Sequence, residues 1–243
     1  MAYASICDLK TREVSNWVWV LAYPTGFALT LVAVATDALN LETVILSAGI
    51  SLVLGFALLY FGFYGGADAK ALIFIALTFP TYPTAFKPLP GDIAFPTVLT
   101  MFFNSVLLSL IYPLTVFALN VKDALRGKKM FEGINATLRE KALLLFTARK
   151  IGLDKLDKSL AYFPSETIVK QDGKLTRKPL HFIKAEADLS PYLSTLKENR
   201  ELYKKGVLAT PTMPYMIFLA LALVLIPLGN LILFLIRYLL KIP

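Results

Sequence analysis

Two aspartates stand at the edges of apolar segments, and their positions suggest acid–base chemistry. Asp8 follows the short start MAYASIC, and Asp68 follows two glycines within YGGADAKAL, residues 64–72. A carboxylate in or beside a membrane segment is energetically costly, so each is a candidate functional group. If the two carboxyl groups lie close together, they cannot easily both ionise, and they share a proton. One can then act as a base on a water molecule while the other, protonated, polarises a peptide carbonyl.

The glycines before Asp68 allow two interpretations. Gly65 and Gly66 could form a turn that lets an extended substrate backbone approach the Asp68 carboxylate. Gly62 and Gly66 also form a GxxxG pattern, which on a membrane helix usually marks a packing face. Asp8 taken alone would more often be a boundary charge than a catalytic group. Only the pairing of the two aspartates favours a catalytic site.

The elements that must position these aspartates are membrane-spanning helices. Of the 243 residues, 56% are hydrophobic, which exceeds the roughly 45–50% typical of soluble domains. Runs of about 20 apolar residues are long enough to cross a bilayer as helices. Four long runs and one shorter run lie at Asn16–Ala35, Val44–Phe63, Ala69 to about Thr84, Phe95–Leu119 and Pro214–Leu240. The chain is therefore predicted to be a polytopic α-helical membrane protein.

The charged residues are concentrated in one segment. Residues 122–206 hold 19 of the 25 Lys and Arg and 11 of the 17 Asp and Glu, so they carry the whole net charge of +8. The bias of Lys and Arg toward the cytoplasmic side, together with Lys10, Arg12 and Lys70, places this segment and both aspartates at the cytoplasmic face. No aromatic-interleaved basic motif or helix-turn-helix pattern is present. A nucleic-acid partner is therefore not expected.

The basic segment is long enough to form a domain of its own. Residues 136–151 are amphipathic enough for a helix, and Asp172-Gly173 is typical of the turn of a β-hairpin. Residues 189–205 could form a second helix that ends at Gly206. The predicted organisation is membrane helices at 1–120, a small cytoplasmic α+β domain at 121–212, and a C-terminal transmembrane helix at 213–243.

Other catalytic arrangements have few residues to draw on. Cys7 is the single cysteine, which excludes an internal disulfide and a cysteine-rich zinc cluster. His181 is the single histidine and is expected to be a structural side chain. No metal and no other cofactor are therefore expected.

The sequence around Asp68 resembles a known motif. Gly65-Gly66-Ala67-Asp68, followed by Ala69-Lys70 and an apolar helix, resembles the GxGD motif of intramembrane aspartyl proteases, with Ala67 in place of the second glycine. Within that group the chain is similar to the archaeal preflagellin and prepilin peptidases, relatives of the bacterial type IV prepilin peptidases. Asp8, followed by LKTREV and NWVWV, resembles that family's first catalytic aspartate. The late basic domain and the final span also resemble the archaeal branch.

The resemblance implies an aspartyl endopeptidase of the plasma membrane, with Asp8 and Asp68 as its catalytic pair at the cytoplasmic boundary. The substrate would be an archaeal preflagellin or prepilin, cut between a positively charged leader and an apolar helix. The family carries a complete membrane helix before its first aspartate, where this chain has seven residues. We therefore expect five to six spans with the first one truncated. We also expect Asp8 to be weakly anchored and too far from Asp68 for one water to bridge.

Two other classes of function stay open. The chain could be a non-enzymatic membrane platform of a pilus or archaellum assembly system, with its basic domain bound to a cytoplasmic partner. It could also be a proton-coupled carrier in which Asp8 and Asp68 relay protons, although the spans lack further charges or inverted repeats. Neutralising either aspartate would abolish cleavage by a protease, abolish transport by a carrier, and barely affect a platform.

Overall fold

The computed structural model divides into two compact units. It describes residues 1–62, 65–82, 96–158, 161–171, 174–180 and 188–241. Unit 1 comprises Met1–Ser109 and Pro214–Pro243, and unit 2 comprises Leu110–Met213. The helix at 111–125 packs against the helix at 138–147. The start of unit 2 therefore lies before residue 121, where the basic domain was expected to begin.

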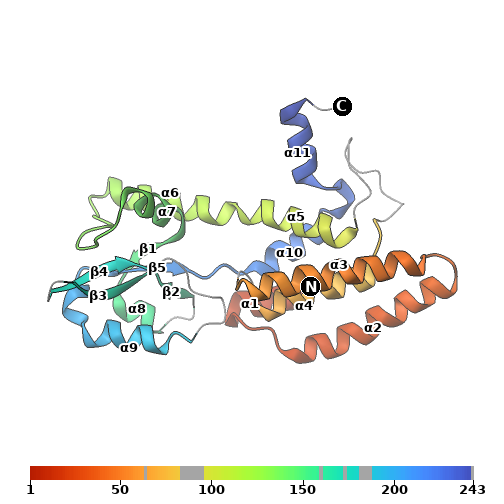
Figure 1. Cartoon of the computed structure of the whole chain (residues 1–243), viewed down its shortest axis with the longest axis horizontal. Coiled ribbons are helices and arrows are strands. Elements are labelled where there is room, and N and C mark those ends of the chain that lie inside the picture. The colour runs from red at the N-terminus through yellow and green to blue at the C-terminus, as the bar shows by residue number, and fades with distance from the viewer. Residues whose placement is uncertain (63–64, 83–95, 159–160, 172–173, 181–187, 242–243) are drawn as a thin grey trace. The chain divides into compact units, whose positions relative to one another are not determined.

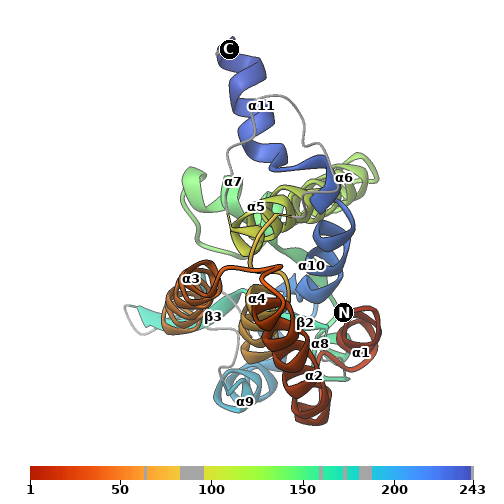
Figure 2. The same ribbon diagram turned by 90° about the vertical axis from the view of Figure 1, so that its right-hand side faces the viewer.

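Unit 1 is helical and is organised around α4. Its helices are α1 (Ala2–Thr11), α2 (Asn16–Ala35), α3 (Leu41–Tyr60), α4 (Gly66–Thr78), α5 (Thr97–Ser109), α10 (Tyr215–Val224), the short 3-10 helix η2 (Ile226–Leu228) and α11 (Leu231–Leu240). Figure 2 shows α4 between α2 and α3, and α4 also contacts α5 and α10. Small and aliphatic residues of α4, including Ala69, Leu72 and Ile75, are buried at these contacts. The helix that begins with Asp68 is thus held on several sides.

Local signals explain where the helices of unit 1 begin and how closely they pack. The Ser15 side chain accepts a hydrogen bond from the Trp17 N–H at the start of α2, and Asn40 accepts one from the Glu42 N–H at the start of α3. Within α2, Gly26 faces α4 so closely that a Cβ atom there would lie 2.6 Å from Thr78 Oγ1. Only a glycine permits this approach.

Three helices of the described residues are long and apolar enough to cross a membrane, or four if a bent pair counts as one span. They are Asn16–Ala35, Leu41–Tyr60 and Thr97–Leu125, with the bent pair formed by Tyr215–Val224 and Ile226–Leu240. Exposed apolar side chains cover α2 and α3, as expected for surfaces that face lipid. Helix α4, with 13 residues, rises about 20 Å and falls short of a hydrocarbon core of about 30 Å. The span expected at Ala69 to about Thr84 is therefore not a complete crossing in the described part of the chain.

The last span is broken, whereas one continuous helix was expected over Pro214–Leu240. The two halves are bent by 53° around Pro227, which cannot donate a backbone hydrogen bond, and Gly229, which has a φ of 84°. The buried Asn104 side chain binds both sides of the break. It donates to the Gly229 carbonyl oxygen at 2.9 Å and accepts from the Leu231 N–H at 2.8 Å. Helix α11 then restarts with Asn230 as its cap.

Unit 2 combines helices with two small antiparallel sheets (Figure 1). Its elements are α6 (Ile111–Leu125), α7 (Leu138–Thr147), β1 (Arg149–Ile151), α8 (Leu153–Lys158), β2 (Tyr162–Pro164), β3 (Glu166–Gln171), β4 (Lys174–Pro179), α9 (Ser190–Glu198), the 3-10 helix η1 (Arg200–Tyr203) and β5 (Val207–Pro211). β5 is the middle strand of the order β1-β5-β2, and β3 pairs with β4. The described residues thus form a small mixed helix-and-sheet unit.

The structure refines the expectations for this segment. The β3–β4 pairing, with Gln171 opposite Lys174, confirms the hairpin, although its turn residues 172–173 lie outside the described residues. The helix expected over 136–151 ends at Thr147, because residues 149–151 leave it to pair with β5 as β1. The helix expected over 189–205 is split into α9 and η1. His181 lies outside the described residues.

A buried ion pair lies at the centre of unit 2. The Arg177 guanidinium donates to both carboxylate oxygens of Glu166, at 2.6 and 2.9 Å, and the two side chains are 5% and 0% exposed. Glu166 also accepts from the Leu208 N–H, and Arg177 donates to the carbonyls of Leu202 and Gly206. Each charge is therefore surrounded by hydrogen-bond partners, as a buried ion pair requires.

Candidate active site

Asp68 lies in the first turn of α4. Its Oδ2 accepts the backbone N–H of Gly65, the residue that caps the helix, at 3.4 Å. A carboxylate in this position is favoured by the positive end of the helix dipole. Lys70, two residues later, donates instead to the Asn16 side chain at 2.7 Å. The lysine of the motif is therefore engaged with α2.

Gly65 lies near the Asp68 carboxylate, but its described surroundings do not require a glycine. Gly65 has an extended backbone with a φ of −81°, so its backbone conformation does not require a glycine. A Cβ atom on Gly65 would meet only Asp68 Oδ2, at 3.9 Å. Gly62 follows α3 while Gly66 begins α4. The two glycines are thus on different elements, and the GxxxG pattern is not a packing face of one helix.

Asp8 lies on α1 and is bound to the start of α10. Its Oδ2 accepts the Met216 N–H at 3.1 Å, and the Ser5 hydroxyl donates to the Met216 carbonyl oxygen at 3.0 Å. Met216 belongs to the first turn of α10, where backbone N–H groups lack partners within the helix. Ala4 and Ser5 are buried. Asp8 and the nearby Ser5 thus each form one hydrogen bond with Met216 of α10. That Asp8 is held less firmly than in a relative with a complete first helix stays a prediction.

The two carboxyl groups influence each other electrostatically. Burial raises the pKa of Asp68 to about 7, and the nearby charge of Asp8 contributes to this rise, while the Gly65 N–H opposes it. Burial also raises the pKa of Asp8, against the effects of the Met216 N–H and the Arg12 charge. Among the described residues, neither carboxylate forms an ion pair. Near neutral pH the pair therefore tends to retain one proton.

The sequence did not predict that α10 would supply a hydrogen bond to Asp8. α10 contacts both α1 and α4, so the start of α10 and the start of α4 each supply a backbone N–H to one of the two aspartates. The available signal was Pro214, which precedes α10 and is typical of a helix start. The sequence does not indicate which distant side chain the new helix start would bind.

No metal site is evident in the described part of the chain, where no group of three or more His, Cys, Asp or Glu side chains could hold an ion. Cys7 is a free, half-buried thiol on α1. The chemistry that this arrangement supports is therefore that of two interacting carboxyl groups.

Comparisons with known proteins show similarity over the segment that contains Asp8 and Asp68. Residues 1–114, which contain both aspartates, match the type IV leader peptidase family. This match covers 114 of the 243 residues, so this part of the chain is similar to that family. The chain is also 27% identical over 234 residues to a preflagellin peptidase of Methanococcus voltae, covering 92% of this chain and 89% of the relative. An uncharacterized protein of Methanocaldococcus jannaschii is 26% identical over 174 residues, covering 71% of this chain and 52% of that relative. The resemblance drawn from the motif is thus confirmed.

Proposed function

We propose that this chain is an aspartyl endopeptidase of the plasma membrane that removes the leader peptide of an archaeal preflagellin or prepilin. The match of residues 1–114 to a leader peptidase family and the similarity to a preflagellin peptidase support the substrate class. The proposal that the peptidase is of the aspartyl type rests on one observation. Asp8 and Asp68 are half-buried carboxyl groups whose charges interact.

In the proposed mechanism the pair holds one proton, mainly on Asp68, because its pKa is raised to about 7. The Asp68 carboxyl group donates a hydrogen bond to the carbonyl oxygen of the scissile peptide. The Asp8 carboxylate takes a proton from a water molecule, whose oxygen attacks the carbonyl carbon. The proton then passes to the leaving amide nitrogen as the C–N bond breaks, giving a carboxylic acid and an amine.

The position of the pair suits a substrate that enters the membrane. Asp68 lies at the start of the apolar helix α4, and Asp8, on α1, accepts a hydrogen bond from the start of the apolar helix α10. The basic composition of residues 122–206 favours the cytoplasmic side. A precursor whose scissile bond directly precedes an apolar helix would present that bond at the same boundary. This placement leaves the charged leader in water and the apolar helix in lipid.

The test uses single neutralising changes in the complete chain. Asp8→Asn and Asp68→Asn should each reduce cleavage of a preflagellin by about 10²–10⁴-fold, since an amide cannot exchange the proton. Asp37→Asn, at an exposed residue between α2 and α3, removes the same charge and should cleave normally. Cleavage is followed by the loss of leader length on a gel. Normal cleavage by either of the first two variants would exclude a two-aspartate mechanism and favour a non-enzymatic role.

A further inference from the structure

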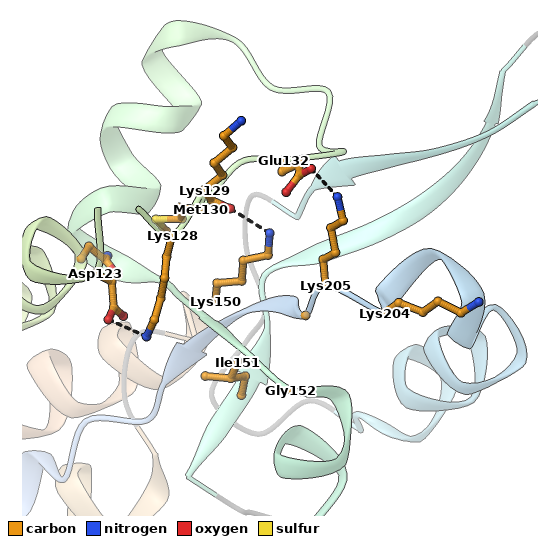
Figure 3. A pocket seen from close by; sticks show the side chains of 12 residues that line it. Asp123, Lys128, Lys129, Met130, Glu132, Lys150, Ile151, Gly152, Lys204 and Lys205 are labelled. Atoms are coloured by element: carbon orange, nitrogen blue, oxygen red, sulfur yellow. Dashed lines mark hydrogen bonds and ion pairs between the residues drawn. The ribbon is translucent and has the colours of Figure 1, made fainter. Parts of the chain in front are cut away.

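Unit 2 contains a basic pocket that the proposed peptidase activity does not use. The pocket has a volume of about 460 Å³, within the range of small-molecule sites. Five lysines line it together with Asp123 and Glu132, so the lining carries a net charge of +3 (five minus two). The lysines are Lys128, Lys129, Lys150, Lys204 and Lys205 (Figure 3).

The acids of the pocket are already paired. Lys128 Nζ lies 2.7 Å from one Asp123 carboxylate oxygen, and Arg149 lies 2.7 Å from the other. Glu132 pairs with Lys205 at 2.6 Å. Neither acid is therefore free to neutralise the lysines that remain.

Lys150 is the most confined of these cations. It extends from β1 and is half-buried, and its ammonium donates a hydrogen bond to the Lys129 carbonyl oxygen at 2.8 Å. An ammonium has three donors, and within the described ranges Lys150 has no ion pair. Burial lowers the pKa of Lys150, with a further contribution from the Arg177 and Lys205 charges against those of Glu132 and Glu166. The positive charge at this point lacks a counter-ion.

The wall of the pocket beside Lys150 is rigid. Gly206 has a φ of 98°, and a Cβ atom there would lie 2.8 Å from the Ile151 carbonyl oxygen, so the two backbone segments are in close contact. The buried Arg177 fixes the same point by donating to the Gly206 carbonyl oxygen at 3.0 Å. Figure 3 shows Lys150 and Lys205 reaching toward the same space, while Lys204 points away from it. A site formed in advance loses little entropy when it binds a ligand.

We propose that this pocket binds a phosphate-bearing ligand, with the Lys150 and Lys205 ammonium groups facing its oxygens. Lysine is a common phosphate ligand because its ammonium acts as a compact point charge. A phosphate monoester carries about −1.5 to −2 charge near pH 7, which would offset at least half of the net positive charge of the lining. A soluble phosphate compound and the headgroup of an anionic phospholipid share this chemistry.

The first experiment locates the ligand by the reactivity of single lysines. The complete chain in neutral phosphatidylcholine nanodiscs is acylated with an amine reagent, with and without inorganic pyrophosphate, and the rate at each lysine is measured by mass spectrometry. Bound phosphate should slow acylation of Lys150 about tenfold by keeping its amine protonated and covered. Lys170, exposed on β3 and outside the pocket, is the internal control and should not change.

A second arm separates the two sources of phosphate. Phosphatidylglycerol replaces part of the neutral lipid, and pyrophosphate is left out. Protection of Lys150 by pyrophosphate would assign a soluble ligand, and protection only by phosphatidylglycerol would assign a lipid headgroup. No selective protection of Lys150 in either arm would overturn the proposal.

Variants then test the contribution of the pocket to binding. Lys150→Gln and Lys170→Gln lose the same charge, and binding is measured with the compound, pyrophosphate or phosphatidylglycerol, that protected Lys150 from acylation. Lys150→Gln should weaken binding about tenfold, and Lys150→Arg, which keeps the charge, should retain most of it. Lys170→Gln loses the same charge elsewhere in unit 2 and should bind normally. Equal weakening by Lys150→Gln and Lys170→Gln would show a diffuse surface effect and contradict the proposal. If Lys150→Gln does not fold, the proposal is tested by the binding of Lys150→Arg and by the acylation rates of the natural chain.

Discussion

The two units of this protein bury carboxyl groups in opposite ways. In unit 2, the fully buried Glu166 accepts two hydrogen bonds from Arg177 and a third from the Leu208 N–H. In unit 1, Asp68 accepts one long hydrogen bond from the Gly65 N–H, and its charged neighbour is another acid, Asp8. Glu166 has a cation as its partner, whereas burial and a neighbouring acid raise the pKa of Asp68.

This difference separates a structural acid from one suited to catalysis. Arg177 engages both carboxylate oxygens of Glu166, so Glu166 suits a fixed role in folding. A carboxyl group without a cation, next to a second acid, changes protonation near neutral pH. The fully buried acid is thus the less suitable catalyst, because its partners satisfy its charge.

The largest effect on stability is expected at the paired acid. Glu166→Gln removes the carboxylate and leaves the buried Arg177 charge without its counter-ion, which should lower the free energy of unfolding of unit 2 by about 3–5 kcal/mol. Hydrogen exchange of the strands on either side measures the loss. Glu201→Gln, which removes the exposed partner of Lys204, should leave exchange nearly unchanged. Similar exchange in the two variants would mean that burial does not distinguish these pairs.

A smaller loss of stability is expected in unit 1, where the neutral Asn104 side chain bonds to the break between α10 and α11. Asn104→Leu leaves the Gly229 carbonyl and the Leu231 N–H without their partner at the break between α10 and α11. A hydrogen bond of this kind contributes about 0.5–1.5 kcal/mol net, so loss of the two should cost about 1–3 kcal/mol in total. Thermal unfolding in detergent measures it.

The control for that change lies on the same helix. Ser109→Ala removes a hydroxyl that bonds only to the preceding turn of α5, and it should shift the unfolding temperature little. If Asn104→Leu behaved like Ser109→Ala, the bend would be set by Pro227 and Gly229 alone.

The smallest effect is expected from pH, because Asp8 and Asp68 are half-buried and solvent screens them. The pKa of Asp68 rises from 3.8 to about 7 on folding, so the folded state holds a proton that the unfolded chain releases. Stability from this group is greatest below about pH 4 and is lost as the pH rises through about 7. The unfolding temperature should therefore fall between pH 5 and pH 8 more in the natural chain than in Asp68→Asn.

The rate of cleavage should depend on the same proton, and therefore on pH. Activity should decline above about pH 7, where the shared proton is lost, and also in acid, where both carboxyl groups are protonated. Asp37→Asn should keep the pH profile of the natural chain. A profile that is flat from pH 5 to pH 9 would show that the pair does not share a catalytic proton.

The sequence alone predicted the features that depend on neighbouring residues. It placed α2 at Asn16–Ala35, because the apolar run there has the length of a membrane-spanning helix. It paired β3 with β4 through the turn residues between them. It also proposed Asp8 and Asp68 as candidate residues, because the two acids form a possible pair beside apolar runs. Each of these signals lies within one or two turns of the chain.

The tertiary structure alone decided which distant groups meet. Hydropathy predicted one last span, but Asn104 on α5 stabilises its break at Gly229. Asp8 accepts a hydrogen bond from the Met216 N–H, 208 residues away along the chain, and Glu166 forms an ion pair with Arg177. Helix starts and apolar runs depend on local energies that a short window of sequence contains. A buried carboxylate's pKa depends on the burial and charges around it, which exist only once the chain has folded.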